Sequence, residues 1–383
     1  MSNQFDIIIV GTGHAGYTLA RNVHKRSPDL SMLLITADDG SYYSKPMLSN
    51  GLAKNKSAQD LAAQSSEAMA ASLDATIITR TRVTSIEPAT KSIVTDSADY
   101  QYQSLVLACG AQQIKLPIQG DGAEDTLTVN DLDDYALFRE RLTDVSQVAV
   151  MGPGLIGCEF ANDLATVGKT TIIIGPDTRP LERLVPEPAS AALKQAMDTL
   201  GVQWHLETVV QQIDRTATGY LLTLASGVSV EAGLVISAAG LKPDLTLAIG
   251  AGLETRQGIV VDGYLRTSDP DIYALGDCAE VEGQVLPYIM PIMHAARALS
   301  STLSGTPEKV TYPAMPVVIK TPVHPVVVAV PGDKKADAEW ITEGTDAGVK
   351  ARYESSDGQL LGFVLTGELV KEKSKLEREL PKP

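Results

Sequence analysis

Two glycine-rich turns give this chain residues with the spacing that binds the phosphates of a dinucleotide. The first turn follows the apolar run 7–10, which has the unalternating composition of a buried parallel strand, and a helical face follows at Ala15, Leu19 and Val23. Glycines let such a turn bend tightly and let a pyrophosphate approach the backbone at the helix N-terminus. We therefore expect the first dinucleotide to contact Gly11, Thr12, Gly13, His14, Ala15 and Gly16.

The same pattern returns in the middle of the chain. The run 147–151 predicts a strand, and Gly152, Gly154 and Gly157 follow it with G-x-G-x-x-G spacing, before a helix that includes Glu159. One such turn can occur in a protein without a ligand, but two in one chain indicate two bound dinucleotides.

Groups for the sugar and base of the first dinucleotide are expected after neighbouring strands. A Rossmann unit usually places an acid after its second strand for the ribose hydroxyls, but here Thr36 and Ala37 come first and Asp38 follows. The ribose contact is then expected from the backbone of Thr36 and Ala37, or residues 38–40 form only a turn. Val83 is a candidate to bind an adenine through its backbone.

A third strand, 272–275, ends at Gly276 and Asp277, where α/β sheets hold their ligands. Asp277 can accept a hydrogen bond from a sugar-like hydroxyl there. Ile289 precedes a predicted helix in which Pro291 takes the first position, so that the positive helix end faces an anionic part of the ligand.

Composition limits the other classes of function. A chain of 383 residues with 44% hydrophobic content can form two or three domains, and its net charge of -15 argues against nucleic acid and anionic membranes as partners. The sequence predicts neither a membrane span nor a signal region, so a cytoplasmic location is the default expectation. The three cysteines and five histidines lack the spacing of a metal site, and we expect no metal.

These patterns predict an α/β protein with two Rossmann-like dinucleotide-binding domains and a small C-terminal α+β domain. We place the first part of the first domain at 1–113, the second domain at 114–238, the return to the first at 239–313, and the C-terminal domain at 314–383. The alanine-rich segment 58–72 predicts one helix.

The chain resembles the two-dinucleotide flavoprotein oxidoreductases over nearly its whole length, and within them the rubredoxin–NAD(+) reductases of bacterial alkane oxidation. They belong to the non-disulfide branch of the pyridine nucleotide-disulfide oxidoreductases. The matching motifs are GTGxAG at 11–16, ITADDG at 35–40, YSKPMLS at 43–49, GLIGCEFANDL at 154–164, IYALGDCAE at 272–280 and MPVVIKTP at 315–322. The resemblance implies FAD in the first and third sections, NADH in the middle section, and a C-terminal domain beside the flavin.

The resemblance also implies roles for charged residues. Related flavoproteins pair the glutamate at position 159 with a lysine beside the flavin, and Lys45 is the nearest replacement here, so Lys45 and Glu159 are the expected catalytic pair. Lys320 lies in an apolar strand and is expected either to bind the flavin or to help dock the partner. The C-x₄-C pair of disulfide reductases and the single cysteine of NADH oxidases are both missing from this sequence, so electrons should leave the flavin directly.

The sequence therefore predicts an enzyme that carries electrons from NADH through FAD to two successive rubredoxin molecules in a transient complex, with a monomer favoured over a stable oligomer. Two alternatives remain open. One is the flavorubredoxin reductase of nitric-oxide detoxification, and the other is a redox-responsive FAD-binding interaction protein with negligible turnover. The middle section lacks an acid directly after its second strand, where Gly175 stands, so the preference for NADH over NADPH rests on the resemblance.

Overall fold

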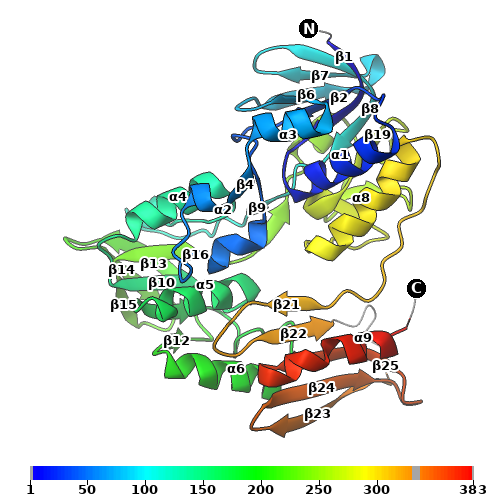
Figure 1. Cartoon of the computed structure of the whole chain (residues 1–383). Helices are drawn as coiled ribbons and strands as arrows, with labels where there is room; N and C mark the ends of the chain where they lie inside the picture. The colour runs from blue at the N-terminus through cyan, green and yellow to red at the C-terminus, as the bar shows by residue number, and fades with distance from the viewer. Residues whose placement is uncertain (1–2, 330–336, 382–383) are drawn as a thin grey trace. The chain divides into compact units, whose positions relative to one another are not determined.

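The structure is a computed structural model that describes residues 3–329 and 337–381, and it divides into two compact units (Figure 1). The first unit contains residues 1–45, 62–112 and 241–312. The second unit contains residues 46–61, 113–240 and 313–383.

The first unit is built on a mainly parallel sheet whose strands end at one edge. The sheet has the order β5-β2-β1-β8-β7-β6, and β19 also pairs with β8. The ends of the five parallel strands are aligned, because Val10 lies beside Ile35 and Leu107, Ile35 lies beside Ile78, and Leu107 lies beside Ala274. The turns that follow these strands therefore share one edge of the sheet. The strands are β1 (Gln4–Val10), β2 (Met32–Ile35), β5 (Thr76–Ile78), β6 (Val83–Glu87), β7 (Ser92–Thr95), β8 (Asp99–Leu107) and β19 (Ile272–Ala274).

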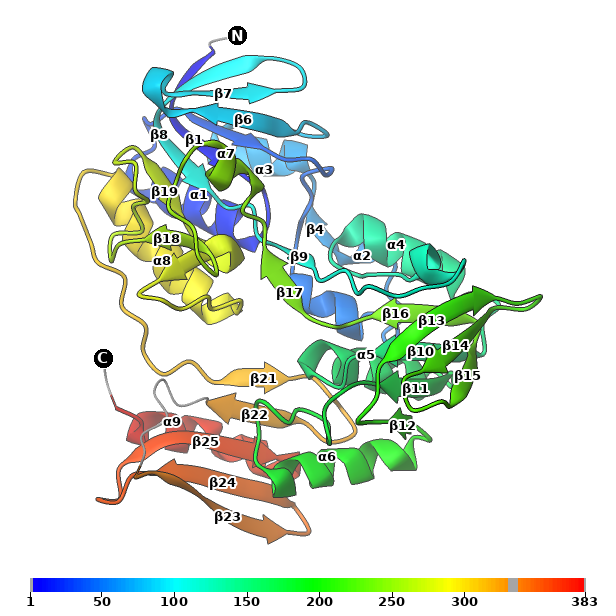
Figure 2. The same cartoon turned by 180° about the vertical axis from the view of Figure 1, so that it is seen from behind.

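Two helices of the first unit, α1 (His14–Arg26) and α8 (Ile289–Leu303), pack against each other and lie side by side in Figures 1 and 2. Their apolar faces close the core formed by the β-branched and leucine residues of β1, β2 and β8. The remaining elements are short: β3 (Tyr42–Tyr43), β4 (Ala62–Gln64), α3 (Ser66–Leu73), η2 (Pro88–Thr90), β9 (Ala111–Gln113), β17 (Leu241–Pro243), α7 (Thr246–Gly250), β18 (Ile259–Val261), η4 (Gly276–Cys278) and β20 (Ala279–Val281), with η1 (Lys45–Asn50) leading into the second unit.

The single helix predicted at 58–72 is wrong. The segment forms α2 (Ala58–Leu61), the strand β4, and then α3, because Ser65 starts a new helix by accepting a hydrogen bond from the backbone N–H of Ala68. Alanine content favoured helix throughout, but this cap and the pairing of β4 with β3 override it.

The start of α8 also differs from the prediction. The helix begins at Ile289, so Pro291 is its third residue rather than its first. Proline is tolerated there because the N–H groups of the first helical turn have no partner within the helix.

The second unit has its own parallel sheet in the order β12-β11-β10-β16, with the three-stranded antiparallel sheet β13-β14-β15 beside its core (Figure 2). The strands of the two sheets are β10 (Gln147–Met151), β11 (Thr170–Ile174), β12 (Gln203–His205), β13 (Val210–Arg215), β14 (Tyr220–Leu224), β15 (Ser229–Ala232) and β16 (Leu234–Ser237). The helical elements are η3 (Ala123–Asp125), α4 (Leu132–Arg141), α5 (Leu155–Thr166) and α6 (Glu187–Thr199).

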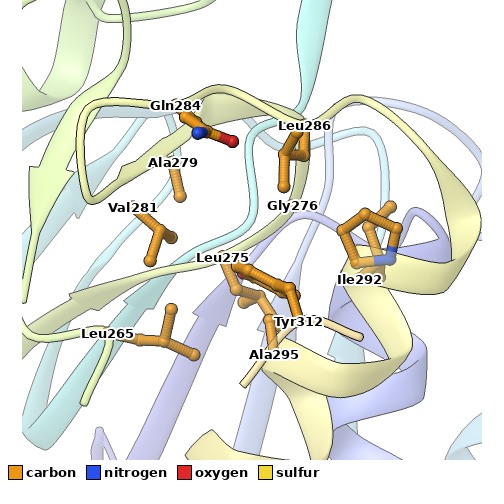
Figure 3. A pocket seen from close by; sticks show the side chains of 11 residues that line it. Leu265, Leu275, Gly276, Ala279, Val281, Gln284, Leu286, Ile292, Ala295 and Tyr312 are labelled. Atoms are coloured by element: carbon orange, nitrogen blue, oxygen red, sulfur yellow. The ribbon is translucent and has the colours of Figure 1, made fainter. Parts of the chain in front are cut away.

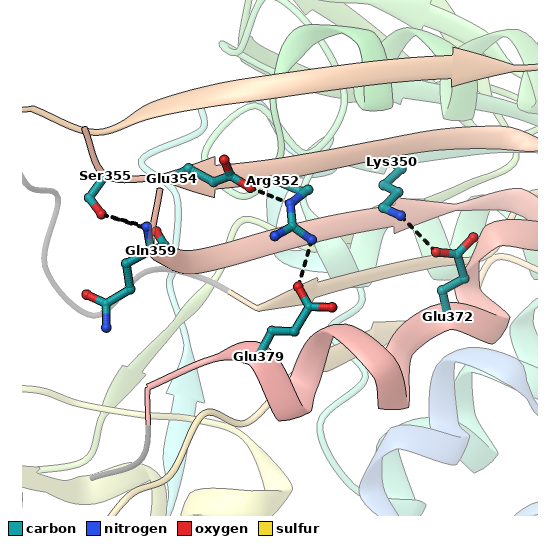
Figure 4. Close-up of polar contacts among 7 residues, drawn as sticks. All are labelled: Lys350, Arg352, Glu354, Ser355, Gln359, Glu372 and Glu379. Carbon is teal, nitrogen blue, oxygen red and sulfur yellow. Dashed lines mark hydrogen bonds and ion pairs between the residues drawn. The ribbon is translucent and has the colours of Figure 1, made fainter. Parts of the chain in front are cut away.

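The C-terminal section of the second unit is an antiparallel sheet in the order β21-β22-β25-β24-β23. Ion pairs of Lys350 with Glu372 and of Arg352 with Glu379, both at 2.9 Å, hold the last helical segment on β24 (Figure 4). Leu376 of that segment is fully buried, and α6 packs against β24 and β25. The elements are β21 (Val317–Ile319), β22 (Val326–Ala329), β23 (Glu339–Thr345), β24 (Gly348–Glu354), β25 (Leu360–Thr366), η5 (Gly367–Glu372) and α9 (Lys373–Glu379).

Candidate dinucleotide sites

The first glycine turn joins β1 to α1, and two of its glycines are required by the protein's own backbone. Gly11 has φ of +112°, and a Cβ atom there would lie 2.3 Å from the carbonyl oxygen of Ala108. A Cβ atom on Gly16 would lie 1.9 Å from the carbonyl oxygen of Gly11. A Cβ atom on Gly13 would meet no described atom within 4 Å, so this glycine borders open space at the N-terminus of α1. That space is where a pyrophosphate can approach the backbone.

The second turn, between β10 and α5, repeats this geometry. Gly152 has φ of +120° and faces the carbonyl oxygen of Ala238 at 2.5 Å from the Cβ position, and Gly157 faces the carbonyl oxygen of Gly152 at 1.9 Å. Gly154 again has no described atom within 4 Å of its Cβ position. Both turns thus have a phosphate-binding form.

Asp277 and the first glycine turn lie at the same edge of the first sheet. A Cβ atom on Gly276 would lie 2.8 Å from the Cβ of Ala15, so the two segments are in contact. Asp277 Oδ1 and both ring nitrogens of His14 are buried, and none has a hydrogen-bond partner among the described residues. Burial raises the pKa of Asp277, which the charge of Lys45 opposes, and burial lowers the pKa of His14. Unsatisfied polar atoms beside an open glycine turn fit a bound sugar-phosphate chain.

The segment after β2 forms a turn that uses the side chain of Asp38. Asp38 Oδ1 accepts hydrogen bonds from Thr36 Oγ1 at 2.7 Å and from the backbone N–H of Gly40 at 2.9 Å. The backbone N–H of Thr36 donates to Ile78, and its carbonyl oxygen accepts from Thr81, two residues before Val83. Thr36 is buried and Ala37 is exposed, so Ala37 is the better placed of the two for a ribose contact. The roles of Thr36, Ala37 and Val83 stay predictions.

A small pocket in the first unit is lined by Gly276 and by Pro291 and Ile292 of the first turn of α8. Its lining side chains are aliphatic except for Gln284 and Tyr312 (Figure 3). Its volume of about 10 Å³ is close to what one water molecule needs, so it is a gap in the packing and not a site for part of a ligand.

The carboxylate of Glu159, in the second unit, accepts four hydrogen bonds. The side chain is fully buried on α5, and its carboxylate accepts two hydrogen bonds from Lys320 Nζ, at 2.7 Å on Oε1 and 2.6 Å on Oε2. The backbone N–H of Lys320 donates to Oε1 at 2.7 Å, and the hydroxyl of Ser49 donates to Oε2 at 2.5 Å. Lys320 keeps 29% of its side chain exposed, so the ammonium is fixed by the carboxylate at the border of the buried region.

The structure pairs Glu159 with Lys320, whereas the resemblance predicts Lys45 as its partner. Lys45 belongs to the first unit, where it lies near Asp277, and its pairing with Glu159 stays a prediction. Because Lys320 already neutralises the carboxylate, Lys45 is not needed for that purpose.

Sequence reasoning missed two further polar residues of α5, Asn162 and Asp163, and the serine at position 49. Asp163 accepts hydrogen bonds from the backbone N–H groups of Leu52 and Ala53 at 2.8 and 3.0 Å. Asn162 Oδ1 accepts one from the backbone of Val323 at 3.2 Å. The signal was present, since Glu159, Asn162 and Asp163 have the i, i+3, i+4 spacing of one helix face within an otherwise apolar helix.

Two negative findings apply to the described part of the chain. None of its helices is both long enough and apolar enough to cross a membrane. Within residues 3–329 and 337–381, the histidine, cysteine, aspartate and glutamate side chains form no group that could hold a metal ion.

Comparisons with known proteins agree with this geometry. Residues 5–302 match the family model described as pyridine nucleotide-disulphide oxidoreductase, and residues 309–380 match the one described as rubredoxin binding C-terminal domain. The chain is 44% identical to a rubredoxin-NAD(+) reductase of Alcanivorax borkumensis, over 98% of each protein. It is 38% identical to a nitric oxide reductase FlRd-NAD(+) reductase of Vibrio vulnificus, over 98% of this chain and 97% of the relative. A crystal structure of a ferredoxin reductase from Rhodopseudomonas palustris has the same fold, with a TM-score of 0.88 and 23% identity over 98% of this chain and 95% of the other.

Proposed function

The chain belongs to the pyridine nucleotide-disulphide oxidoreductase family, and we propose that it oxidises NADH and passes the electrons to rubredoxin. The observation that carries the proposal is the match of residues 309–380 to a rubredoxin binding domain, in a chain that also has two dinucleotide turns. One NADH supplies two electrons, so each turnover gives NAD⁺, one proton and two reduced rubredoxin molecules.

FAD and NAD(H) are the cofactors of this enzyme, as in its family. Bound FAD supplies the conversion between a hydride, which carries two electrons, and single electrons that an iron protein can accept. We propose that the first glycine turn holds the FAD pyrophosphate, Asp277 the ribityl chain, and Ile289 at the start of α8 the flavin ring. Gly152, Gly154 and Gly157 are proposed to hold the pyrophosphate of NADH.

The Glu159–Lys320 pair is proposed to act at the cofactors. A buried carboxylate with hydrogen bonds from Lys320 Nζ, Lys320 N–H and Ser49 keeps the ammonium in one position, so that Lys320 meets a bound cofactor without reorganisation. Glu159 thus acts through Lys320 as well as by lying beside the second glycine turn.

Lys45 is proposed to act in hydride transfer from its place near Asp277. The variant Lys45→Met should slow reduction of the flavin by NADH more than it weakens NADH binding. Stopped-flow absorbance measures the first quantity, and calorimetric titration with NAD⁺ measures the second. Unchanged flavin reduction would refute this role.

A thiol relay is not part of the proposed route. The three cysteines are free, and Cys158 and Cys278 are buried. Burial raises the pKa of the Cys278 thiol to about 11 and raises the pKa values of Cys109 and Cys158 as well. Because the thiolate is the reactive form, these cysteines are poor electron carriers near neutral pH.

The second candidate is reduction of flavorubredoxin. Its support is the 38% identity to the nitric oxide reductase FlRd-NAD(+) reductase of Vibrio vulnificus, which is lower than the 44% to the rubredoxin-NAD(+) reductase. We therefore favour free rubredoxin, and a rubredoxin that serves an alkane hydroxylase is the more specific form of the proposal. The third candidate, a redox-responsive FAD-binding protein without turnover, predicts slow bleaching of the flavin by NADH.

The deciding experiment supplies the FAD-loaded enzyme with NADH and a panel of iron proteins: rubredoxin, flavorubredoxin and a plant-type ferredoxin. Loss of the absorbance of each oxidised iron centre gives the rate. We expect rubredoxin to be reduced fastest, with two molecules reduced per NADH. Faster reduction of flavorubredoxin would favour the second candidate, and no reduction of any acceptor would contradict the proposal.

Docking of the partner is proposed to be small and transient, as redox encounters usually are. The variant Lys320→Ala tests whether Lys320 takes part, and Lys350→Ala is the matched control, because Lys350 pairs with Glu372 in the same section. A changed salt dependence of rubredoxin reduction in Lys320→Ala alone supports a docking role.

The monomeric state and the cytoplasmic location expected from the sequence remain parts of the proposal.

A further inference from the structure

The segment between β11 and α6 lies where a dinucleotide-binding unit contacts the adenosine ribose. Residues 175–185, here called the ribose loop, follow the second strand of the second unit. They also touch the second glycine turn, since the backbone N–H of Leu181 donates to the carbonyl oxygen of Pro153 at 2.9 Å. In such units, an acid about twenty residues after the glycine turn binds the ribose hydroxyls of NAD.

The ribose loop cannot carry that acid directly after β11. A Cβ atom on Gly175 would lie 2.2 Å from Cδ of Pro153, so a residue with a side chain would collide with the proline ring of the glycine turn. The first acid of the loop is therefore Asp177, two residues later, with 20% of its side chain exposed.

The loop also contains two arginines, and Arg179 is held inside it. Arg179 Nη1 lies 3.1 Å from Glu182 Oε1, and Nη2 donates to the carbonyl oxygen of Val185 at 3.3 Å. Arg179 Nε is buried. Glu182 is itself fixed by the backbone N–H and the hydroxyl of Thr178, at 2.8 and 3.0 Å. The guanidinium is thereby directed to groups of the loop itself.

The other arginine is weakly held. Arg183 keeps 84% of its side chain exposed, and its contact with Asp177 Oδ1 is 3.5 Å long. An exposed pair of this kind contributes little energy and is screened by salt. Arg179, whose guanidinium is held in one position, is therefore the cation that decides whether a 2′-phosphate on the ribose finds a positive partner.

We propose that Glu182 is a specificity-determining residue that retains Arg179 within the ribose loop, so that the loop binds the ribose of NADH and rejects the 2′-phosphate of NADPH. This inference rests on the proposed function and names the residue that sets its nucleotide preference. A 2′-phosphate brings close to two negative charges beside Asp177 and Glu182, while Arg179 is engaged with Glu182. Specificity then arises from a repulsive element as well as from attraction.

The test compares Glu182→Ala, Glu182→Gln and the double variant Arg179→Ala/Glu182→Ala in the FAD-loaded enzyme. Calorimetric titration of the oxidised enzyme with NAD⁺ and NADP⁺ measures binding, and stopped-flow absorbance measures the rate constant of flavin reduction by NADH and by NADPH. In Glu182→Ala we expect NADP⁺ to bind about five- to tenfold more tightly than in the wild type, the scale of a few partly exposed charge interactions. Binding of NAD⁺ should change by less than about threefold.

Three further variants separate the released arginine from a simple loss of negative charge. Glu187→Ala removes an exposed acid from the first turn of α6 and should leave both affinities unchanged. Glu182→Gln keeps the size of the side chain but not its charge, and should give most of the gain in NADP⁺ affinity that is expected of Glu182→Ala. The double variant should lose the gain, because Arg179 provides it.

An unchanged ratio of NADP⁺ to NAD⁺ affinity in Glu182→Ala would overturn the inference, and so would a gain that persists without Arg179. Rubredoxin reduction by NADH is measured in the same preparations. Its absence contradicts the proposed function, whereas normal rubredoxin reduction with an unchanged nucleotide ratio contradicts only the role of Glu182.

Discussion

The two glycine turns have the same steric design, but the helices that follow them differ. In each turn the first and third glycines are forced by backbone atoms of the chain itself, and the middle glycine borders open space. Helix α1 then buries Tyr17, Leu19 and Val23 against its own unit. Helix α5 instead buries the polar residues Glu159, Asn162 and Asp163.

The polar face of α5 binds segments that are distant in sequence. Glu159 and Asn162 hold residues 320–323, and Glu159 and Asp163 hold residues 49–53. Helix α5, which follows the second glycine turn, thus also anchors the C-terminal section and the segment after Lys45 within the second unit. The comparison shows that the form of each turn depends on neighbouring backbone atoms. The helix that follows is less constrained, so its buried face can be apolar, as in α1, or can bind distant segments, as in α5.

The largest expected effect separates the glycines that the backbone requires from the glycine that we propose faces the ligand. Gly16→Val and Gly157→Val place Cβ within 1.9 Å of a backbone oxygen, and we expect each to lose more than about 4 kcal/mol of folding free energy. Gly13→Val should stay folded but purify without FAD, because its side chain fills the space beside the helix N-terminus. Thermal unfolding and the flavin absorbance of purified protein measure the two outcomes.

Gly154→Val extends the same test to the second unit. It should keep FAD and lose NAD⁺ binding in calorimetric titration. A yellow Gly13→Val protein with full flavin content would contradict the assignment of the first turn to FAD.

The second largest expected effect is a loss of stability when the polar face of α5 loses a partner. Lys320→Met leaves the fully buried carboxylate of Glu159 without its cation, and we expect a loss of about 3 kcal/mol in urea unfolding. The double variant Glu159→Gln/Lys320→Met should recover part of this loss, because no buried charge then remains unpaired. Lys350→Met removes a lysine from a more exposed pair and should cost about 0.5 kcal/mol. Equal losses in Lys320→Met and Lys350→Met would show that Glu159 does not depend on Lys320.

Asp163 gives a smaller effect with a distinctive dependence on pH. Burial raises its pKa above the ordinary value of 3.8, although the backbone bonds from Ala53 and Leu52 oppose the shift. The folded state therefore binds the proton more tightly than the unfolded state. The stabilisation that protonated Asp163 contributes is fully present below the pKa that Asp163 has in the unfolded chain. It decreases as pH rises through the raised pKa that Asp163 has in the folded protein.

Asp163→Asn cannot titrate, and it retains only one of the two acceptor oxygens. We expect it to cost about 2 kcal/mol at low pH, with a smaller cost above the raised pKa. Urea unfolding of both proteins across this range measures the difference. A cost that grows with rising pH would show that the pKa of Asp163 is lowered rather than raised.

Local patterns in the sequence were sufficient to predict the two glycine turns and the fold class. The strand, glycines and helix of each turn are neighbours in the chain, and their steric requirements are local. The partner of Glu159 was not predictable in this way, because Lys320 stands 161 positions later and only tertiary packing brings it to α5. The break in the helix predicted at 58–72 was likewise decided by a cap at Ser65 and by strand pairing, which alanine content does not report.

The smallest expected effect tests the acids that follow the second strand of each unit. Asp38 Oδ1 serves the turn after β2 through Thr36 and Gly40, so Asp38→Ala should cost about 1 kcal/mol of stability. The side chain of Asp177 makes a long contact with the exposed Arg183, so Asp177→Ala should change stability by less than about 0.5 kcal/mol. It should weaken NAD⁺ binding instead, because its carboxylate is the first one available to the ribose after Gly175. Urea unfolding and titration with NAD⁺ on both variants separate the two roles, and a loss of NAD⁺ affinity in Asp38→Ala but not in Asp177→Ala would reverse the assignment.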